Sequence, residues 1–119
     1  MEHLANQEQS IELLQQLGLK EYEAKSFVAL SRLPQGTAKE ISEISEVPRT
    51  RVYDSIRVLE QKGLVEIHHS NPKQFRTVSI DEAVNILKSE YVTRIESLKE
   101  KLTELEPAGT DEETEITHE

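Results

Sequence analysis

The stretch that decides the fold lies at residues 47 to 63 and reads Val-Pro-Arg-Thr-Arg-Val-Tyr-Asp-Ser-Ile-Arg-Val-Leu-Glu-Gln-Lys-Gly. Pro48 is expected to be the first helical residue, where its missing N–H costs nothing, and Gly63 is expected to end the helix. At about 100° per residue, three apolar side chains share one side of such a helix: Val52, Ile56 and Leu59. The spacing predicts an amphipathic helix from about Pro48 to Lys62 whose apolar side is buried.

The other side of this helix carries side chains that can bond to DNA. They are Thr50, Tyr53, Asp54, Arg57 and Gln61, flanked by Arg49 and Arg51. Arginine can fork onto guanine or a phosphate, threonine and glutamine can bond base edges, and tyrosine can contact a phosphate or a thymine methyl. We expect most contacts from residues 49 to 53, because such helices enter the major groove with their N-terminal residues. The alternative is an ordinary solvated face, which Asp54 and Glu60 favour because they would repel DNA.

Two helical patterns come before this segment, near the start of the chain. Apolar side chains three and four positions apart predict helices over about residues 7–17 and 20–33. The inward side chains are expected to be Ile11, Leu14 and Leu17 in the first helix and Tyr22, Ala24, Phe27 and Leu30 in the second. Gly18 ends the first helix and Pro34-Gln35-Gly36 ends the second.

A third, short helix is predicted directly before the deciding stretch. Thr37-Ala38-Lys39-Glu40 matches a capping box, in which the threonine hydroxyl and the glutamate carboxylate each bond a free backbone N–H at a helix start. Ile41 and Ile44 give this helix its buried side, and Ser45-Glu46-Val47 forms the turn after it. A helical core whose last two helices are joined by a tight turn predicts a helix-turn-helix arrangement.

After Gly63 the pattern changes from helical to alternating. Two β-prone runs are joined by the turn Ser70-Asn71-Pro72-Lys73: Leu64, Val65 and Ile67, then Phe75, Thr77 and Val78. Two strands with a basic turn, directly after such a helix, predict a wing. Lys73 and Arg76 are the expected phosphate contacts, unless they are solvated charges that keep an edge strand from aggregating. Phe75 is expected in the core.

A second capping box, Ser79-Ile80-Asp81-Glu82, predicts a helix that runs to about Leu105. Its apolar positions are Val84, Leu87, Tyr91, Ile95, Leu98, Leu102 and Leu105. We expect the first turns to pack on the domain. The regular spacing of four and three from Tyr91 to Leu105 is typical of a coiled-coil seam, so a dimer is predicted through Tyr91, Ile95, Leu98, Leu102 and Leu105.

The charge of the chain is unevenly distributed. The net charge of −9 argues against a nucleic-acid partner, but residues 106–119 alone contribute −6. Residues 47–79 carry six bases and three acids, a local charge of +3. Because the distribution of charge decides the electrostatic footprint, DNA stays a candidate partner. The acidic tail at residues 106–119 is too polar to fold alone, and it could mimic DNA and inhibit the binding face.

Several classes of protein are disfavoured by composition. The chain has no cysteine, and His68 and His69 are expected on opposite faces of a strand, so no metal site and no cofactor are predicted. No nucleophile is paired with a base and no glycine-rich phosphate loop occurs, so we do not expect an enzyme. The absence of a signal peptide or a long apolar run predicts a cytoplasmic protein without membrane contact.

Four segments carry a family resemblance: Leu17-Gly18-Leu19-Lys20-Glu21-Tyr22-Glu23-Ala24-Lys25, Thr37-Ala38-Lys39-Glu40-Ile41, Val47-Pro48-Arg49-Thr50-Arg51-Val52-Tyr53-Asp54 and Leu59-Glu60-Gln61-Lys62-Gly63-Leu64-Val65. From about Ile11 to Leu105 the chain resembles the winged-helix domain of TrmB-like transcriptional regulators. The resemblance implies archaeal or bacterial transcription control by dimers on operator DNA. It places Arg49, Thr50, Arg51 and Tyr53 at the DNA-facing start of the recognition helix and Lys73 on the wing.

Three features depart from the family pattern. Lys20 stands where members often have a capping threonine, and Glu46 stands where the turn usually has glycine. The larger members also carry a C-terminal sugar-sensing domain, whereas this sequence continues into a helix and an acidic tail. No sugar ligand is therefore expected.

Together these features predict a mainly α, α+β winged helix-turn-helix fold with a helical core, a two-stranded wing and a long C-terminal dimerisation helix. The expected domains are residues 1–79, the dimerisation helix 80–105 and the tail 106–119. We expect a homodimeric, sequence-specific transcriptional regulator, with residues 48–62 in the major groove of a palindromic operator and the wing, residues 69–74, on the backbone. The DNA-binding candidates are Thr37, Arg49, Thr50, Arg51, Tyr53, Arg57, Lys73 and Arg76. The alternative is a winged-helix adaptor that binds proteins and not DNA.

Overall fold

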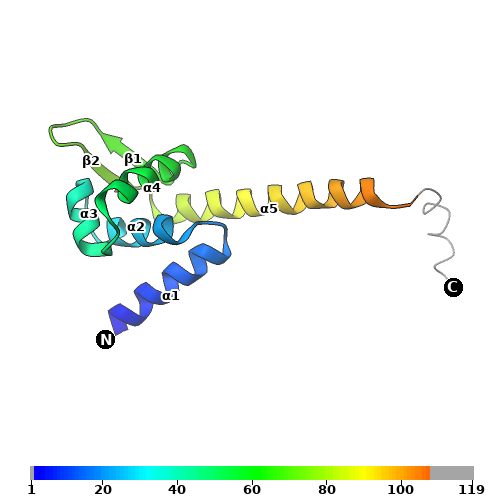
Figure 1. Cartoon of the computed structure of the whole chain (residues 1–119), viewed down its shortest axis with the longest axis horizontal. Coiled ribbons are helices and arrows are strands. Elements are labelled where there is room, and N and C mark those ends of the chain that lie inside the picture. Colours follow the sequence, from blue (N-terminus) through cyan, green and yellow to red (C-terminus); the bar gives the residue numbers. More distant parts are fainter. Residues whose placement is uncertain (1, 108–119) are drawn as a thin grey trace. The chain divides into compact units, whose positions relative to one another are not determined.

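The computed structural model describes residues 2–107, with side chains from residue 4 onward (Figure 1). Most of the acidic tail therefore lies outside the described residues. The helices and strands are α1 (Glu2–Gln16), α2 (Glu21–Ser31), α3 (Ala38–Ser45), α4 (Arg49–Gln61), β1 (Val65–His68), β2 (Gln74–Thr77) and α5 (Ile80–Leu105). The chain divides into a compact unit up to Lys88 and a second unit from Ser89. The predicted mainly α, winged helix-turn-helix fold is confirmed.

The first unit is built around the packing of α2 against α3 and α4. The predicted apolar side of α4 is buried, since Val52, Ile56 and Leu59 are each at most 3% exposed. Leu30 and Ile41 join them in the core without any exposed surface. Pro48 lies at the N-cap with extended ψ, so α4 begins one residue later than expected. Burial of this side of α4 directs the opposite side outward.

The predicted capping box at the start of α3 is present. Thr37 Oγ1 accepts a hydrogen bond from the Glu40 N–H at 3.1 Å, and Glu40 Oε1 accepts one from the Thr37 N–H at 2.9 Å. Two of the free N–H groups at this helix start are thereby satisfied. The capping box fixes where α3 begins, close to the start of α4.

The turn between α3 and α4 depends on Glu46, which has left-handed backbone angles of φ 64° and ψ 17°. Its N–H donates to the Ser42 carbonyl at 2.8 Å, while Ser42 Oγ donates to the Val47 carbonyl at 2.6 Å. A side chain in this region strains the backbone by about 1–2 kcal/mol, which is why glycine is usual there. The departure from glycine leaves the turn geometry intact.

Substitutions at Glu46 are expected to separate backbone strain from side-chain chemistry. Glu46→Gly should change the free energy of unfolding by less than about 1 kcal/mol, because relief of strain is offset by the entropy that glycine loses on folding. Glu46→Val should lower it by about 1–2 kcal/mol more than Glu43→Val, since a β-branched residue fits the left-handed region poorly. Glu43 is the matched control because it is exposed and helical in α3. Equal losses in urea denaturation for the two valine variants would contradict this account.

The wing is an antiparallel pair in which Val65 pairs with Thr77 and His68 with Gln74. Gly63, at φ 84°, ends α4 as predicted and leads the chain into β1. Phe75 is buried, as expected, and its backbone forms two 2.8 Å hydrogen bonds with Gly36, a bridge that was not predicted. This bridge attaches the segment before α3 to β2. The wing and the start of α3 therefore form one continuous structure.

The first turns of α5 differ from the prediction in which side chains they bury. Ser79 Oγ accepts from the Glu82 N–H at 3.1 Å, which confirms the cap. Ala83 and Leu87 are buried and Ile86 packs against the core, whereas Val84 is 54% exposed. The expectation that Val84 packs inward was wrong, because the buried face is centred on small Ala83 and runs through Ile86 and Leu87.

Candidate nucleic-acid interface

A groove about 460 Å³ in volume lies between the start of α4, the start of α3 and the wing turn. We call it the wing groove; its lining is Thr37, Ala38, Lys39, Arg49, Tyr53, Pro72, Lys73 and Phe75. Four predicted DNA contacts are brought together here: Thr37, Arg49, Tyr53 and Lys73. Three lining residues are cations and none is an acid. The wing groove can therefore attract an anion.

Lys39 also lines the wing groove, although it is not among the DNA-binding candidates predicted from the sequence. It is exposed and is the second residue of α3, two positions after the capping Thr37. Its position could have indicated this, because Lys39 lies in the first turn of the helix that precedes α4. Thr37 itself uses its hydroxyl to cap α3, accepting from the Glu40 N–H at 3.1 Å.

Two predicted DNA contacts are engaged with carboxylates of the chain. Arg57 Nη1 lies 3.3 Å from Asp54 Oδ1, one turn away on α4. Arg76 Nε lies 2.9 Å from Glu66 Oε1 across the wing. All four side chains are more than half exposed, so solvent and salt screen these pairs and each contributes at most about 1 kcal/mol. A phosphate could replace either carboxylate at small cost.

Arg49 and Arg51 lie on different sides of α4. Arg49 lines the wing groove. Arg51 lies over the ring of Tyr22 in α2, with the guanidinium carbon 5.6 Å from the ring centroid. Thr50 lies between them and is exposed. The two arginines would therefore face different parts of any ligand that lies along α4.

The start of α4 has no capping side chain and no acid in its first turn. The N–H groups of Arg51 and Val52 donate to the Pro48 carbonyl at 2.8 and 2.9 Å. The N–H groups of Arg49 and Thr50 have no such partner in the described part of the chain. Free N–H groups and the helix dipole give this end a partial positive charge that favours an anion.

Other kinds of site find no support in the described residues. Within residues 2–107, histidine, aspartate and glutamate do not gather in groups of three that could hold a metal ion. No helix in that range is both long and apolar enough to cross a membrane.

A helical core, a tight turn, an outward-facing helix and an adjacent two-stranded wing define a winged helix-turn-helix domain of the kind found in transcriptional regulators. A family model, "Sugar-specific transcriptional regulator TrmB", matches residues 14–81. The chain belongs to the TrmB family.

Curated relatives agree with this membership. The chain is 30% identical to the HTH-type sugar sensing transcriptional regulator TrmBL1 of Pyrococcus furiosus over 99 residues, which cover 83% of this chain and 29% of that protein. It is 33% identical to the DNA-binding HTH-type transcriptional repressor TrmBL2 of Thermococcus kodakarensis over 103 residues, which cover 80% of this chain and 39% of that one. The chain thus spans well under half of the length of these relatives.

Solved structures agree on the fold. TrmBL2, described as an archaeal chromatin protein with a novel mode of DNA binding, matches with a TM-score of 0.73 at 28% identity, over 92% of this chain and 42% of that chain. A possible transcriptional regulator from Methanosarcina mazei Go1 matches with a TM-score of 0.60 at 15% identity, over 76% of this chain and 82% of that chain. The second likeness concerns the fold alone.

Proposed function

We propose that the protein is a sequence-specific, DNA-binding transcriptional regulator that acts in the cytoplasm, with α4 in the major groove and the wing on the backbone. The observation that carries the proposal is the wing groove, where Lys39, Arg49 and Lys73 converge from three segments without an acid. Such a convergence at the start of a recognition helix suits phosphate and base edges together. Tyr53 adds a half-exposed ring from the second turn of α4.

A homodimer through α5 is the second part of the proposal. Tyr91, Ile95, Leu98, Leu102 and Leu105 are between 43% and 77% exposed and are spaced four and three apart. Such a seam on a helix that is marginal alone suits a second copy of the same helix. A two-fold dimer would present its recognition helices to half-sites about 34 Å apart, which favours a palindromic operator.

Arg49→Ala is the direct test of DNA binding. The substitution should weaken binding to a duplex selected from a random library by the wild-type protein, by about 1–3 kcal/mol or 5- to 150-fold. Lys73→Ala should reduce the slope of log affinity against log salt by about 1, because one phosphate contact is lost. Fluorescence anisotropy over a salt series measures both.

The matched control is Arg32→Ala, which removes an exposed arginine at the end of α2 that does not line the wing groove. Its DNA affinity should stay within about twofold of wild type, since distant surface substitutions change free energies by about 0.5 kcal/mol or less. If Arg49→Ala and Lys73→Ala bound like this control, the proposed interface would be wrong.

The alternative function is a winged-helix adaptor for proteins, and the net charge of −9 is the observation that favours it. The two functions differ in a titration against random duplex DNA at low salt. A DNA-binding regulator should bind it non-specifically through phosphate contacts, whereas an adaptor should not bind it.

A further inference from the structure

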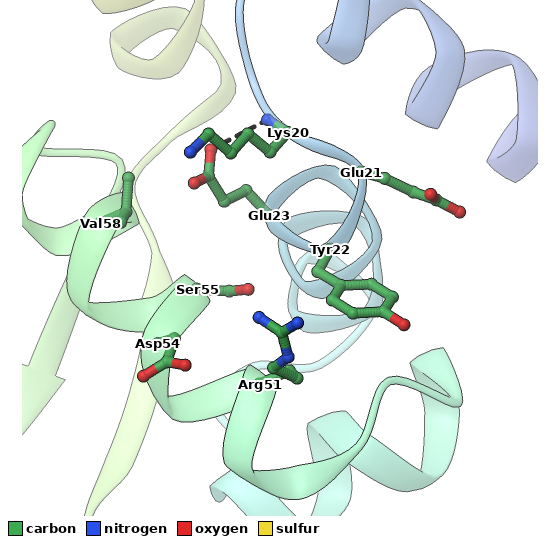
Figure 2. Close-up of a pocket in the computed structure, with 8 residues that line it drawn as sticks. All are labelled: Lys20, Glu21, Tyr22, Glu23, Arg51, Asp54, Ser55 and Val58. Carbon is green, nitrogen blue, oxygen red and sulfur yellow. Dashed lines mark hydrogen bonds between the residues drawn. The ribbon is translucent and has the colours of Figure 1, made fainter.

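A second pocket, about 320 Å³ in volume, lies between the start of α2 and the side of α4 that faces away from the wing groove (Figure 2). We call it the α2–α4 pocket. Its lining comes from α4, from α2 and from the residue before α2: Arg51, Asp54, Ser55 and Val58, then Glu21, Tyr22 and Glu23, and finally Lys20. At about 100° per residue, Arg51 and Ser55 lie roughly half a turn around the helix from Arg49 and Tyr53. The pocket and the wing groove therefore flank the outer face of α4.

The acids around the α2–α4 pocket already have partners. Glu21 accepts a hydrogen bond from Lys25 at 2.9 Å, and this bond raises the pKa of Lys25. Glu23, which is buried, accepts from the Lys20 backbone N–H at 3.0 Å. Asp54 is paired with Arg57 at 3.3 Å. Each of these carboxylates thus has a partner in the protein, and the partner of Glu23 is an uncharged backbone N–H.

The cations and the hydroxyl of the pocket are in the opposite situation. Neither Lys20 nor Arg51 has a carboxylate within salt-bridge distance among residues 4–107. Arg51 is instead stacked over Tyr22, which fixes its guanidinium at the pocket. Ser55 is only 4% exposed, and no hydrogen bond of its hydroxyl is found in that same range. Figure 2 shows the Ser55 hydroxyl and the Arg51 guanidinium both turned into the space between α2 and α4.

The Ser55 hydroxyl faces the pocket and can donate to a ligand that enters it. A guanidinium held by an aromatic ring and a hydroxyl donor beside it match the oxygens of a phosphate. The start of α2 adds backbone N–H groups; Glu23 accepts one of them, from Lys20, and Glu21 and Glu23 place two acids in this first turn. Lys20 and Arg51 can only donate and the Ser55 hydroxyl can donate as well, so a ligand that supplies acceptors would suit all three.

We propose that the α2–α4 pocket binds a backbone phosphate of DNA, on the strand opposite to the one that the wing groove contacts. The inference rests on the proposed function and extends it. A helix in the major groove, which is about 12 Å wide, has a sugar–phosphate strand on each side. Arg51 is then a phosphate anchor positioned by Tyr22, and Ser55 is a second donor to the same group. Base recognition is left to the residues between the two sites.

The test compares Arg51→Ala with Arg49→Ala on two probes: random-sequence duplex and a duplex selected from a random library by the wild-type protein. Arg51→Ala should weaken both equally, by about 10-fold, and lower the salt slope by about 1, because a phosphate contact is independent of sequence. Ser55→Ala should weaken both by a smaller factor and leave the slope unchanged. Arg32→Ala again serves as the control.

A second measurement locates the phosphate. Replacing single phosphates of the selected duplex by neutral methylphosphonates should identify a position that weakens wild type but not Arg51→Ala, on the opposite strand from the position coupled to Lys73. The inference is overturned if no position is coupled to Arg51, or if Arg51→Ala changes only the preference for the selected sequence. It is also overturned if millimolar inorganic phosphate alone saturates the pocket in an NMR titration, which would indicate a small-anion site.

Failure of this inference differs from failure of the proposed function. If wild type binds DNA and Arg49→Ala weakens it while Arg51→Ala does not, only the phosphate anchor is wrong. If wild type binds neither duplex at low salt, the proposed function and the anchor are both wrong.

Discussion

Leu59→Ala is expected to lower the free energy of unfolding by about 2–5 kcal/mol. Leu59 lies on the buried side of α4 with no exposed surface and belongs to the cluster that α4 shares with α2 and the wing. Removing its branched side chain forfeits hydrophobic transfer and leaves a cavity that the surrounding helices cannot fill. Native domains have only about 5–15 kcal/mol of stability in total, so the loss should be visible at once in urea denaturation.

Leu13→Ala is the matched control, because it makes the same change of side chain in another helix at a position that is 57% exposed. Its effect should stay near about 0.5 kcal/mol. Both variants must be measured at one protein concentration, since dimerisation would stabilise the folded state by mass action. A loss for Leu59→Ala no larger than for Leu13→Ala would mean that α4 is not anchored through this side.

If the chain forms the proposed dimer, Leu98→Asp is expected to convert it to a monomer and to weaken DNA binding by about 10²- to 10⁴-fold, through loss of the linked second half-site. Leu98 is the middle residue of the seam from Tyr91 to Leu105 and is 55% exposed in the single chain. In a dimer, two carboxylates would be buried against each other, which costs several kcal/mol. Sedimentation equilibrium measures the association, and anisotropy measures the binding.

Ser97→Asp adds the same charge one residue earlier, outside the seam, and should leave the dimer intact. Leu98→Asp should also leave the fold of the first unit unchanged, because Leu98 lies beyond Lys88, where that unit ends. A dimer that persists in Leu98→Asp would show that the copies associate through another surface, and the seam would then need a different occupant.

The parts of the fold that were predictable from sequence are those with local causes. The apolar spacing of Val52, Ile56 and Leu59 determines the buried side of α4 without reference to any other segment. The capping box at Thr37 and the glycine at position 63 mark helix ends through backbone hydrogen bonding and backbone angles. The wing followed from two β-prone runs around a turn.

The parts that could not be predicted depend on segments far apart in sequence. The bridge between Gly36 and Phe75 involves one residue pair and leaves no periodic signal. Nothing near Arg51 indicates that Tyr22, 29 positions earlier, would lie beneath its guanidinium. Arg76 and Glu66 meet only because of the strand register. Sequence spacing could therefore name the candidate DNA contacts and place Arg49 and Arg51 on different sides of α4, but it could not show which other segments lie beside each of them.

Because the start of α4 has no capping side chain, DNA affinity should be linked to the ordering of its first turn. α3 and α5 begin with a hydroxyl that receives a backbone N–H, whereas Pro48 offers α4 no such group. In the free protein, water must satisfy the first N–H groups of α4. A phosphate bound there would accept hydrogen bonds from these N–H groups and act as the missing cap. Binding of the phosphate would therefore also order the first turn of α4.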